Sequence, residues 1–577
     1  MVRVRIDTTL QEIEEDAFSD CTNLGSAQLH EGLQKICSNA FRGCRSLESI
    51  TTPSTVQEIE ENAFSHCTNL VSVQLQEGLQ GIRWRAFHDC RSLESITIPS
   101  TVQVIEHGVF GNCNNLVSVQ LREGLEKIKI NAFGGCKSLE RITIPSTVQV
   151  IGDHAFRNCT NLVRVQLHEG LTRIESNAFN GCKDLASIII PSTVRVIGYD
   201  AFSDCTNLGS ARLLEGLQKI CSNAFRGCRS LESITIPSTV QEIGYDAFRD
   251  CTNLACVQLH EGLQKISSNE FRDCRSLKST TIPSTVQEIG ECAFDNCTNL
   301  VSVQLHEGLK RIDSNAFYGC KSLERITIPS TVQEISEYAF SDCTNLVSVQ
   351  LHEGLKRIEE NAFYGCKSLE SITTPTTVQE IGFEAFSECT NLVSVHLHEG
   401  LERISHKSFH ECKSLECISV PSSVQMICQE AFIECSHLMR VHLNKGLRKI
   451  ELYAFCDCTS LLSVVIPSTV EVIEESAFAN CQALVNVQLT VGLMEIGAKT
   501  FRGCISLEQI TLPSTVNKIG WEVFKNCQNL VNVQLKKVSR PSGVKYFSTV
   551  PHSSKLSSHP PKPMFNLWMC SKTARGW

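Results

Sequence analysis

Residues 320–340 read CKSLERITIPSTVQEISEYAF, and this pattern decides the fold because it returns along the chain as a 23-residue repeat. A phenylalanine recurs at this spacing from Phe18 to Phe524, which makes 23 copies without an insertion or deletion. A cysteine follows each phenylalanine by three residues and a leucine by six. A fixed period of roughly 20–50 residues is typical of a solenoid, in which each repeat buries its apolar face against its neighbours. The chain is therefore predicted to form one repeat solenoid and not several globular domains.

Each repeat contains a short alternation of apolar and polar residues. In the pairs Val303 and Leu305, and Ile326 and Ile328, the apolar residues are two positions apart. A period of two places both side chains on one face of a strand, so each repeat is predicted to supply one short strand. A turn and a second short extended segment are expected after it. The segment that leads into Ala316–Phe317 is interpreted as a tight helical turn on the far side.

Two types of repeat alternate along the chain, so the full period is a pair of repeats. One type has a proline just past the strand, as at Pro329, and the other has a glycine, as at Gly308. Proline at this place does not interrupt the ladder, while glycine allows a free φ. We interpret the two residues as two solutions to the same turn.

The pattern C-x-x-L-x-x-I-x-I-P-x-x-V-x-x-I-x-x-x-A-F, as in residues 320–340, resembles the BspA-like class of leucine-rich repeat. This resemblance covers residues 1–535. It implies a right-handed solenoid of 23 rungs, each formed by one 23-residue repeat, with short parallel strands on the concave face and short helical or irregular turns on the convex face. Members of this family are often surface or adhesion proteins, and they share no catalytic residues that can be transferred to this chain.

The 31 cysteines are interpreted as a packing feature, because 23 of them occupy the column that faces the core. Strands about 4.8 Å apart would hold these cysteines farther apart than the Cβ separation of about 3.8 Å in a disulfide. Buried, reduced thiols and a reducing compartment are therefore expected. Cys456 and Cys458 have no second pair with which to hold zinc. We expect no metal ion and no cofactor.

The strand positions that point away from the core form the candidate concave binding surface. This surface is small, neutral and polar, and arginines such as Arg325 are the expected recognition points. His306, His352 and His398 lie two rungs apart, about 10 Å, so they cannot share a metal ion, whereas His396 and His398 are a nearer pair that is interpreted as solvated. A pH-sensitive interface and a solvated surface remain alternative interpretations of the histidines. The candidate residues are Ser302, Gln304, His306, Arg325, Thr327, Ser348, Gln350, His352, Ser394, His396 and His398.

The two ends of the chain differ from the repeats. Residues 536–577 hold eight lysines or arginines and no acidic residue, so removing them from the net charge of -9 leaves -17 on residues 1–535. An acidic body of this charge argues against nucleic acid as a partner. The basic tail is predicted to be disordered. Residues 2–13 match only the second half of a repeat, which predicts either end-to-end association through uncapped edges or a partial gene model.

The sequence favours a non-enzymatic scaffold for protein–protein interaction. No P-loop, GxSxG or HExxH pattern is present, and a surface repeated 23 times offers no single convergence of catalytic groups. The alternative is a cell-surface adhesin or receptor that binds glycan or matrix, if an export signal precedes this sequence. As written, the chain has no signal peptide or membrane span and is expected in the cytoplasm. With an export signal it would be surface-exposed or secreted.

Overall fold

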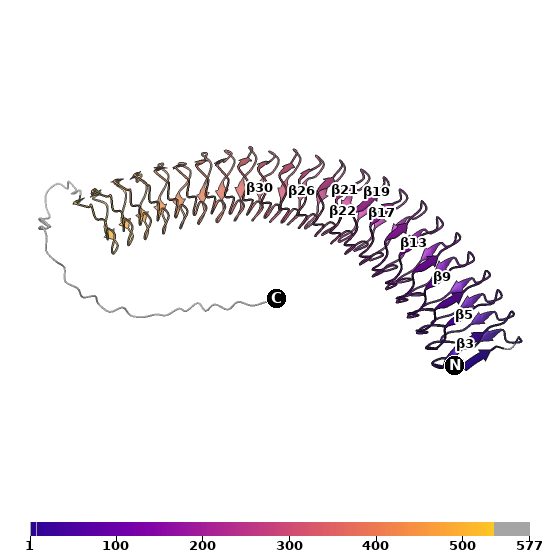
Figure 1. Ribbon diagram of the computed structural model, residues 1–577. Coiled ribbons are helices and arrows are strands. Elements are labelled where there is room, and N and C mark those ends of the chain that lie inside the picture. Colours follow the sequence, from indigo (N-terminus) through magenta and orange to yellow (C-terminus); the bar gives the residue numbers. More distant parts are fainter. Residues whose placement is uncertain (1, 7, 536–577) are drawn as a thin grey trace, which may run out of the picture. The chain divides into compact units, whose positions relative to one another are not determined.

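The computed structural model describes residues 2–6 and 8–535, and Figure 1 shows its 23-residue repeats following one another in chain order. A rung is one repeat, named after its phenylalanine; the Phe271 rung, for example, comprises residues 265–287. Each rung carries two short strands that pair in parallel with the corresponding strands of its neighbours. The predicted parallel-strand solenoid is confirmed, and so is the second extended segment in each repeat. The basic tail, residues 536–577, lies outside the described residues.

Two series of strands alternate along the chain. The odd-numbered strands are β1 (Val2–Arg5), β3 (Leu24–Gln28), β5 (Ser49–Thr51), β7 (Ser72–Gln74), β9 (Ser95–Thr97), β11 (Ser118–Gln120), β13 (Arg141–Thr143), β15 (Arg164–Gln166), β17 (Ser187–Ile190), β19 (Ser210–Leu213), β21 (Ser233–Thr235), β23 (Cys256–Gln258), β25 (Ser279–Thr281), β27 (Ser302–Gln304), β29 (Arg325–Thr327), β31 (Ser348–Gln350), β33 (Ser371–Thr373), β35 (Ser394–His396), β37 (Cys417–Val420), β39 (Arg440–Leu443), β41 (Ser463–Val465), β43 (Asn486–Gln488), β45 (Gln509–Leu512) and β47 (Asn532–Leu535). The even-numbered strands have two residues each: β2 (Glu12–Ile13), β4 (Lys35–Ile36), β6 (Glu58–Ile59), β8 (Gly81–Ile82), β10 (Val104–Ile105), β12 (Lys127–Ile128), β14 (Val150–Ile151), β16 (Arg173–Ile174), β18 (Val196–Ile197), β20 (Lys219–Ile220), β22 (Glu242–Ile243), β24 (Lys265–Ile266), β26 (Glu288–Ile289), β28 (Arg311–Ile312), β30 (Glu334–Ile335), β32 (Arg357–Ile358), β34 (Glu380–Ile381), β36 (Arg403–Ile404), β38 (Met426–Ile427), β40 (Lys449–Ile450), β42 (Val472–Ile473), β44 (Glu495–Ile496) and β46 (Lys518–Ile519).

In both series of strands, paired residues are one repeat apart in the sequence. Ser302 pairs with Arg325, which pairs with Ser348 in the next rung, so each step along the ladder equals one repeat. The odd-numbered ladder continues from β5 to β47, and β1 pairs with β3 ahead of it. The even-numbered ladder falls into two stretches, β2 to β22 and β24 to β46. The break lies between the Phe248 and Phe271 rungs.

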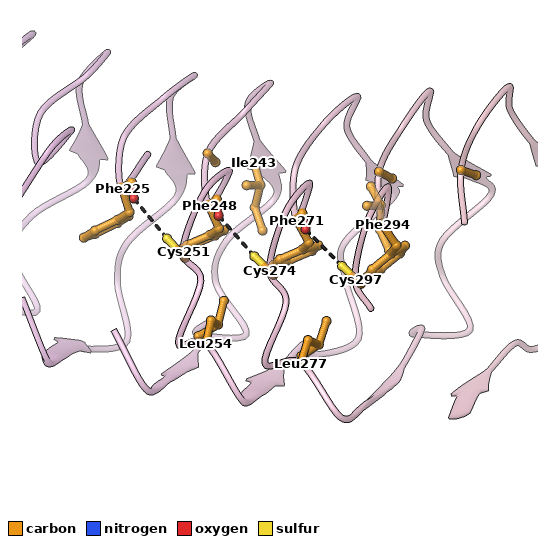
Figure 2. Close-up of a cluster of buried hydrophobic side chains, with 14 of the residues drawn as sticks. Phe225, Ile243, Phe248, Cys251, Leu254, Phe271, Cys274, Leu277, Phe294 and Cys297 are labelled. Carbon is orange, nitrogen blue, oxygen red and sulfur yellow. Dashed lines mark hydrogen bonds between the residues drawn. The ribbon is translucent and has the colours of Figure 1, made fainter. Parts of the chain in front are cut away.

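The phenylalanines stack into one continuous column in the core. Neighbouring ring centroids are 5.1–5.9 Å apart and the rings are close to parallel. Figure 2 shows Phe225, Phe248, Phe271 and Phe294 in this column, with each cysteine beside the phenylalanine of the preceding rung. The thiol of Cys274 donates a hydrogen bond to the carbonyl oxygen of Phe248 at 3.2 Å, and this contact repeats in the other rungs. The column of cysteines is buried, as predicted, and its thiols donate hydrogen bonds to the backbone, which was not predicted.

The turns around the phenylalanines are irregular, and the interpretation of Ala316–Phe317 as a helical turn is wrong. Asn315 and Gly319, two residues before and after Phe317, have φ of 57° and 65°. Both equivalent positions are left-handed in every rung, which a right-handed helical turn does not allow. Within residues 2–6 and 8–535 no helix occurs. The sequence signal was the frequent Asn, Asp and Gly at these positions, the residues that adopt this conformation most easily.

The turn that follows the odd-numbered strand agrees with the sequence. Gly308 has φ of 109°, which confirms that this type of repeat uses the free φ of glycine. In the part of the chain that the structure describes, no helical segment is long and apolar enough to cross a bilayer. At the two ends, β1 pairs with β3 and β47 with β45. End-to-end association through their outer edges stays a prediction.

Candidate functional site: the strand face

The odd-numbered strands present one exposed face, which we call the strand face. It consists of the first and third residues of each strand, while the middle residue is buried. Ser302 and Gln304 on β27, and Arg325 and Thr327 on β29, are all exposed there. The pleat of the strand explains this alternation, because successive side chains point to opposite faces. The assignment of the strand face to the concave side stays a prediction.

A hollow of about 740 Å³ lies over β23, β25, β27 and β29. It brings together four predicted residues, Ser302, Gln304, Arg325 and Thr327. Three successive rungs place a small residue at the first strand position, and the fourth places the long side chain of Arg325 there. Because these three residues are small, the surface of the hollow is deeper there than at Arg325. The polar or charged lining residues that the prediction missed are Cys256, Gln258, His260, Ser279, Thr280 and Thr281.

The other predicted residues lie elsewhere on or beside the strand face and do not line this hollow. Ser348 and Gln350 are on β31, where the serine is half-buried and the glutamine exposed. Ser394 and His396 are on β35, with the same pattern. The remaining three histidines follow their strands by two residues: His306 and His352 are half-buried and His398 is exposed.

Hydrogen bonds between side chains order part of the strand face. Thr235 donates to Gln258 at 3.0 Å and Thr327 donates to Gln350 at 3.4 Å, in each case to the next strand. Thr281 and Gln304 are paired in the same register, but their side chains make no such bond in the described part of the chain. The amide of Gln304 therefore keeps its hydrogen-bonding capacity for a ligand in the hollow.

Thr280, on β25 beneath the hollow, departs from the core pattern. Other rungs have isoleucine, valine or alanine at this position, and Thr280 is equally buried, with 6% of its surface exposed. Its hydroxyl oxygen has no hydrogen-bond partner among the described residues. A buried hydroxyl without a partner is unfavourable by about 1–3 kcal/mol. A threonine in an otherwise apolar column is the sequence signal that could have marked this rung.

The same rung also carries a buried carboxyl group. Glu270 directly precedes Phe271, where most rungs have alanine, and it is fully buried. Its Oε2 accepts a hydrogen bond from the N–H of Ser267 at 2.8 Å, while Oε1 has no partner within the described chain. Burial raises the pKa of Glu270 well above its ordinary value, so the neutral acid is favoured.

Glu270 lies beside the break in the even-numbered ladder. In the regular rungs the residue after the strand donates its N–H to the preceding rung, as Asp313 does to the carbonyl of Ile289 at 3.0 Å. In the Phe271 rung the N–H of Ser267 points to Glu270 instead. The hydroxyl of Ser267 takes the place of the lost donor and binds the carbonyl of Ile243 at 2.5 Å. The Phe271 rung thus borders the break in the ladder and also supplies β25 to the hollow.

The hollow is lined mainly by groups that can form hydrogen bonds. Its exposed side chains are mainly hydroxyls and amides, joined by the guanidinium of Arg325, the thiol of Cys256 and the imidazole of His260. These groups offer hydrogen-bond donors and acceptors along four parallel strands. This arrangement suits recognition of a polar, extended ligand.

The match to a protein-family model agrees with this architecture. The BspA type leucine rich repeat region matches in six copies, at residues 1–117, 80–209, 198–321, 264–373, 356–485 and 448–557. A leucine-rich repeat protein from Bacteroides ovatus is 24% identical, with a TM-score of 0.40, over 77% of this chain and 92% of that one. A leucine rich cell surface protein from Faecalibacterium prausnitzii is 26% identical, with a TM-score of 0.33, over 61% of this chain and 88% of that one. A comparison with curated proteins gives no match. Because the repeat family matches from residue 1 to residue 557, the chain belongs to the BspA-type leucine-rich repeat proteins.

Proposed function

We propose that the protein is a non-enzymatic scaffold that binds an extended segment of a protein partner on its strand face. The single observation that carries this proposal is the hollow over β23 to β29. Here the polar groups of four adjacent strands face one open space. Neighbouring strands are about 4.8 Å apart, so one ligand can contact several rungs in succession.

The lining favours a polypeptide over a nucleic acid. Gln258, Gln304, Thr281 and Thr327 offer neutral amide and hydroxyl groups that match the N–H and C=O groups of an extended peptide. Arg325 adds one positive charge for an acidic side chain or a carbonyl oxygen. The net charge of -17 on residues 1–535 opposes the binding of phosphates.

A displayed peptide library tests this function with a defined probe. Peptides selected on the wild-type chain are expected to lose at least tenfold in affinity for S279W and S302W, which fill the hollow. S371W is the matched control, because Ser371 is an exposed serine at the same position of β33, outside the hollow. Equal binding of the selected peptides to all four proteins would contradict the proposal. Binding of an arrayed glycan that is lost in S279W and S302W, with no peptide selected, would establish the recognition of glycan instead.

We further propose that the protein works in a reducing compartment such as the cytoplasm. The buried thiols of the cysteine column, which donate hydrogen bonds to phenylalanine carbonyls in the core, support this proposal. Imaging of the tagged full-length protein tests it: a cytoplasmic signal is expected. Surface display or secretion would contradict it.

A further inference from the structure

Two histidines and one aspartate meet on the turns of the Phe64 and Phe87 rungs. His66 and Asp89 occupy the same left-handed position of adjacent rungs, with φ of 62° and 57°, and His88 precedes Asp89. The Nδ1 atoms of His66 and His88 lie 3.4 Å and 3.1 Å from Oδ2 of Asp89. One potential ligand atom of each of the three residues lies within 4.8 Å of the others.

These distances fit a bound transition-metal ion. Zinc binds histidine nitrogen and carboxylate oxygen at about 2.0–2.2 Å, so adjacent ligand atoms of a tetrahedron are about 3.3 Å apart. The two measured N–O separations lie on either side of this value.

The surroundings hold the three side chains in place. The side chains of His88 and Asp89 are 13% and 11% exposed, whereas His66 is 45% exposed and leaves an open path from solvent. Arg91 lies 3.5 Å from Oδ1 of Asp89, which orients the carboxylate and leaves Oδ2 toward the imidazoles. Gly111 in the next rung makes room for the imidazole, because a Cβ there would lie 2.8 Å from Cδ2 of His88.

We propose that His66, His88 and Asp89 form a binding site for a zinc-class divalent cation that joins two adjacent rungs. Three protein ligands leave the fourth position open to water or to a ligand group from another molecule. Neither the repeat pattern nor the strand face requires His66, since other rungs have aspartate, asparagine, glycine or glutamate at its position.

Anomalous diffraction at the zinc absorption edge tests the location of the ion. Crystals of the full chain grown with zinc chloride are expected to show a peak about 2.0–2.2 Å from Oδ2 of Asp89 and from one nitrogen of each histidine. Zinc peaks only at other residues, or no peak, would overturn the proposal.

Calorimetric titration with zinc chloride tests the same site in solution. H88A and D89N are expected to weaken one binding event at least tenfold, while H154A, a matched variant of a histidine on another turn, keeps it. Zinc bound by the exposed thiols is common to all these proteins and does not affect the comparison. D89N preserves the shape of the side chain, and thermal melting in EDTA verifies folding. Titrations of H88A and D89N that equal the wild type would overturn the proposal.

Discussion

The Phe271 rung and the Phe317 rung have the same length and the same stacked phenylalanine, but their surroundings differ. Before Phe317 stands a buried alanine, and the ladder on either side of this rung continues unbroken. Before Phe271 stands the buried Glu270, and the ladder is broken there. The comparison shows that the stack of phenylalanines, cysteines and leucines tolerates a local defect, because each rung contacts only its two neighbours. The rung with the defect also supplies β25 to the candidate binding hollow.

The largest effect on stability is expected when a glutamate is placed before Phe317, at the position that Glu270 occupies before Phe271. A316E is expected to lower the free energy of unfolding by about 3–5 kcal/mol, because it buries a carboxyl group without a partner in a packed site. Chemical denaturation measures the loss. A316S is the control, since serine occupies this position in the rung of Phe409, where Ser408 donates to the carbonyl of Gly382. A loss in A316E no larger than in A316S would show that the column accepts carboxylates.

The reverse change, from Glu270 to alanine, is expected to stabilise the Phe271 rung. E270A is expected to raise the free energy of unfolding by about 1–3 kcal/mol at pH 7, because it removes a buried oxygen that has no partner. Chemical denaturation at several pH values measures this gain. E270Q keeps the shape without an ionisable group and separates packing from charge.

The pH dependence of this gain has a defined sign. The pKa of Glu270 is raised in the folded state above its ordinary value of 4.5. Below the ordinary value both states are protonated, and as the pH rises above it only the unfolded state ionises. The wild type therefore loses stability relative to E270A as the pH rises above 4.5, so the gain grows with pH. A gain that shrinks with rising pH would contradict the raised pKa.

A smaller gain is expected at the floor of the hollow. T280V replaces the buried hydroxyl that has no partner with a methyl group of similar size, and it is expected to raise the free energy of unfolding by about 1 kcal/mol. Peptide binding to the hollow is expected to persist, since the exposed residues are unchanged. Loss of stability in T280V would indicate that the hydroxyl has a partner in solution.

The smallest effect on stability is expected for the exposed thiols, which differ from the buried column in reactivity. C256S is expected to change the free energy of unfolding by less than about 0.5 kcal/mol, because Cys256 is exposed on the strand face. In the native protein a thiol reagent is expected to label Cys256 and Cys417 but not Cys274 or Cys320. Burial raises the pKa of the last two well above the ordinary value. Mass spectrometry measures the labelling. Equal labelling of the exposed and the buried cysteines would contradict the packed column of cysteines.

The sequence predicts the architecture well because every rung repeats the same contacts. The columns of Phe317, Cys320 and Leu323 establish the period, and the alternation in residues 302–305 establishes the exposed face. The same regularity made it difficult to recognise the residues that depart from the repeat pattern. Glu270 and Thr280 are polar residues in mostly apolar columns, and their effect depends on burial and on the N–H of Ser267 that bonds to Glu270, which a pattern does not reveal.

The proposed metal site escaped the sequence for a different reason. The separation of His66 and His88 is one position short of a full repeat, so the two histidines fall in different columns. The prediction from the sequence compared only histidines in the same column of the strand face. Those histidines are too far apart to share an ion. The turns bring adjacent columns of adjacent rungs together, and this contact follows from the left-handed residues that were not recognised.

The central claim is that Glu270 diverts one backbone N–H and opens the ladder at a single rung. Hydrogen exchange measured by mass spectrometry, on peptides covering residues 262–271 and 308–317, tests this claim most directly. The first peptide is expected to exchange faster than the second in the wild type, and to match it in E270A. Equal protection of the two peptides in the wild type, or a difference that persists in E270A, would contradict the account.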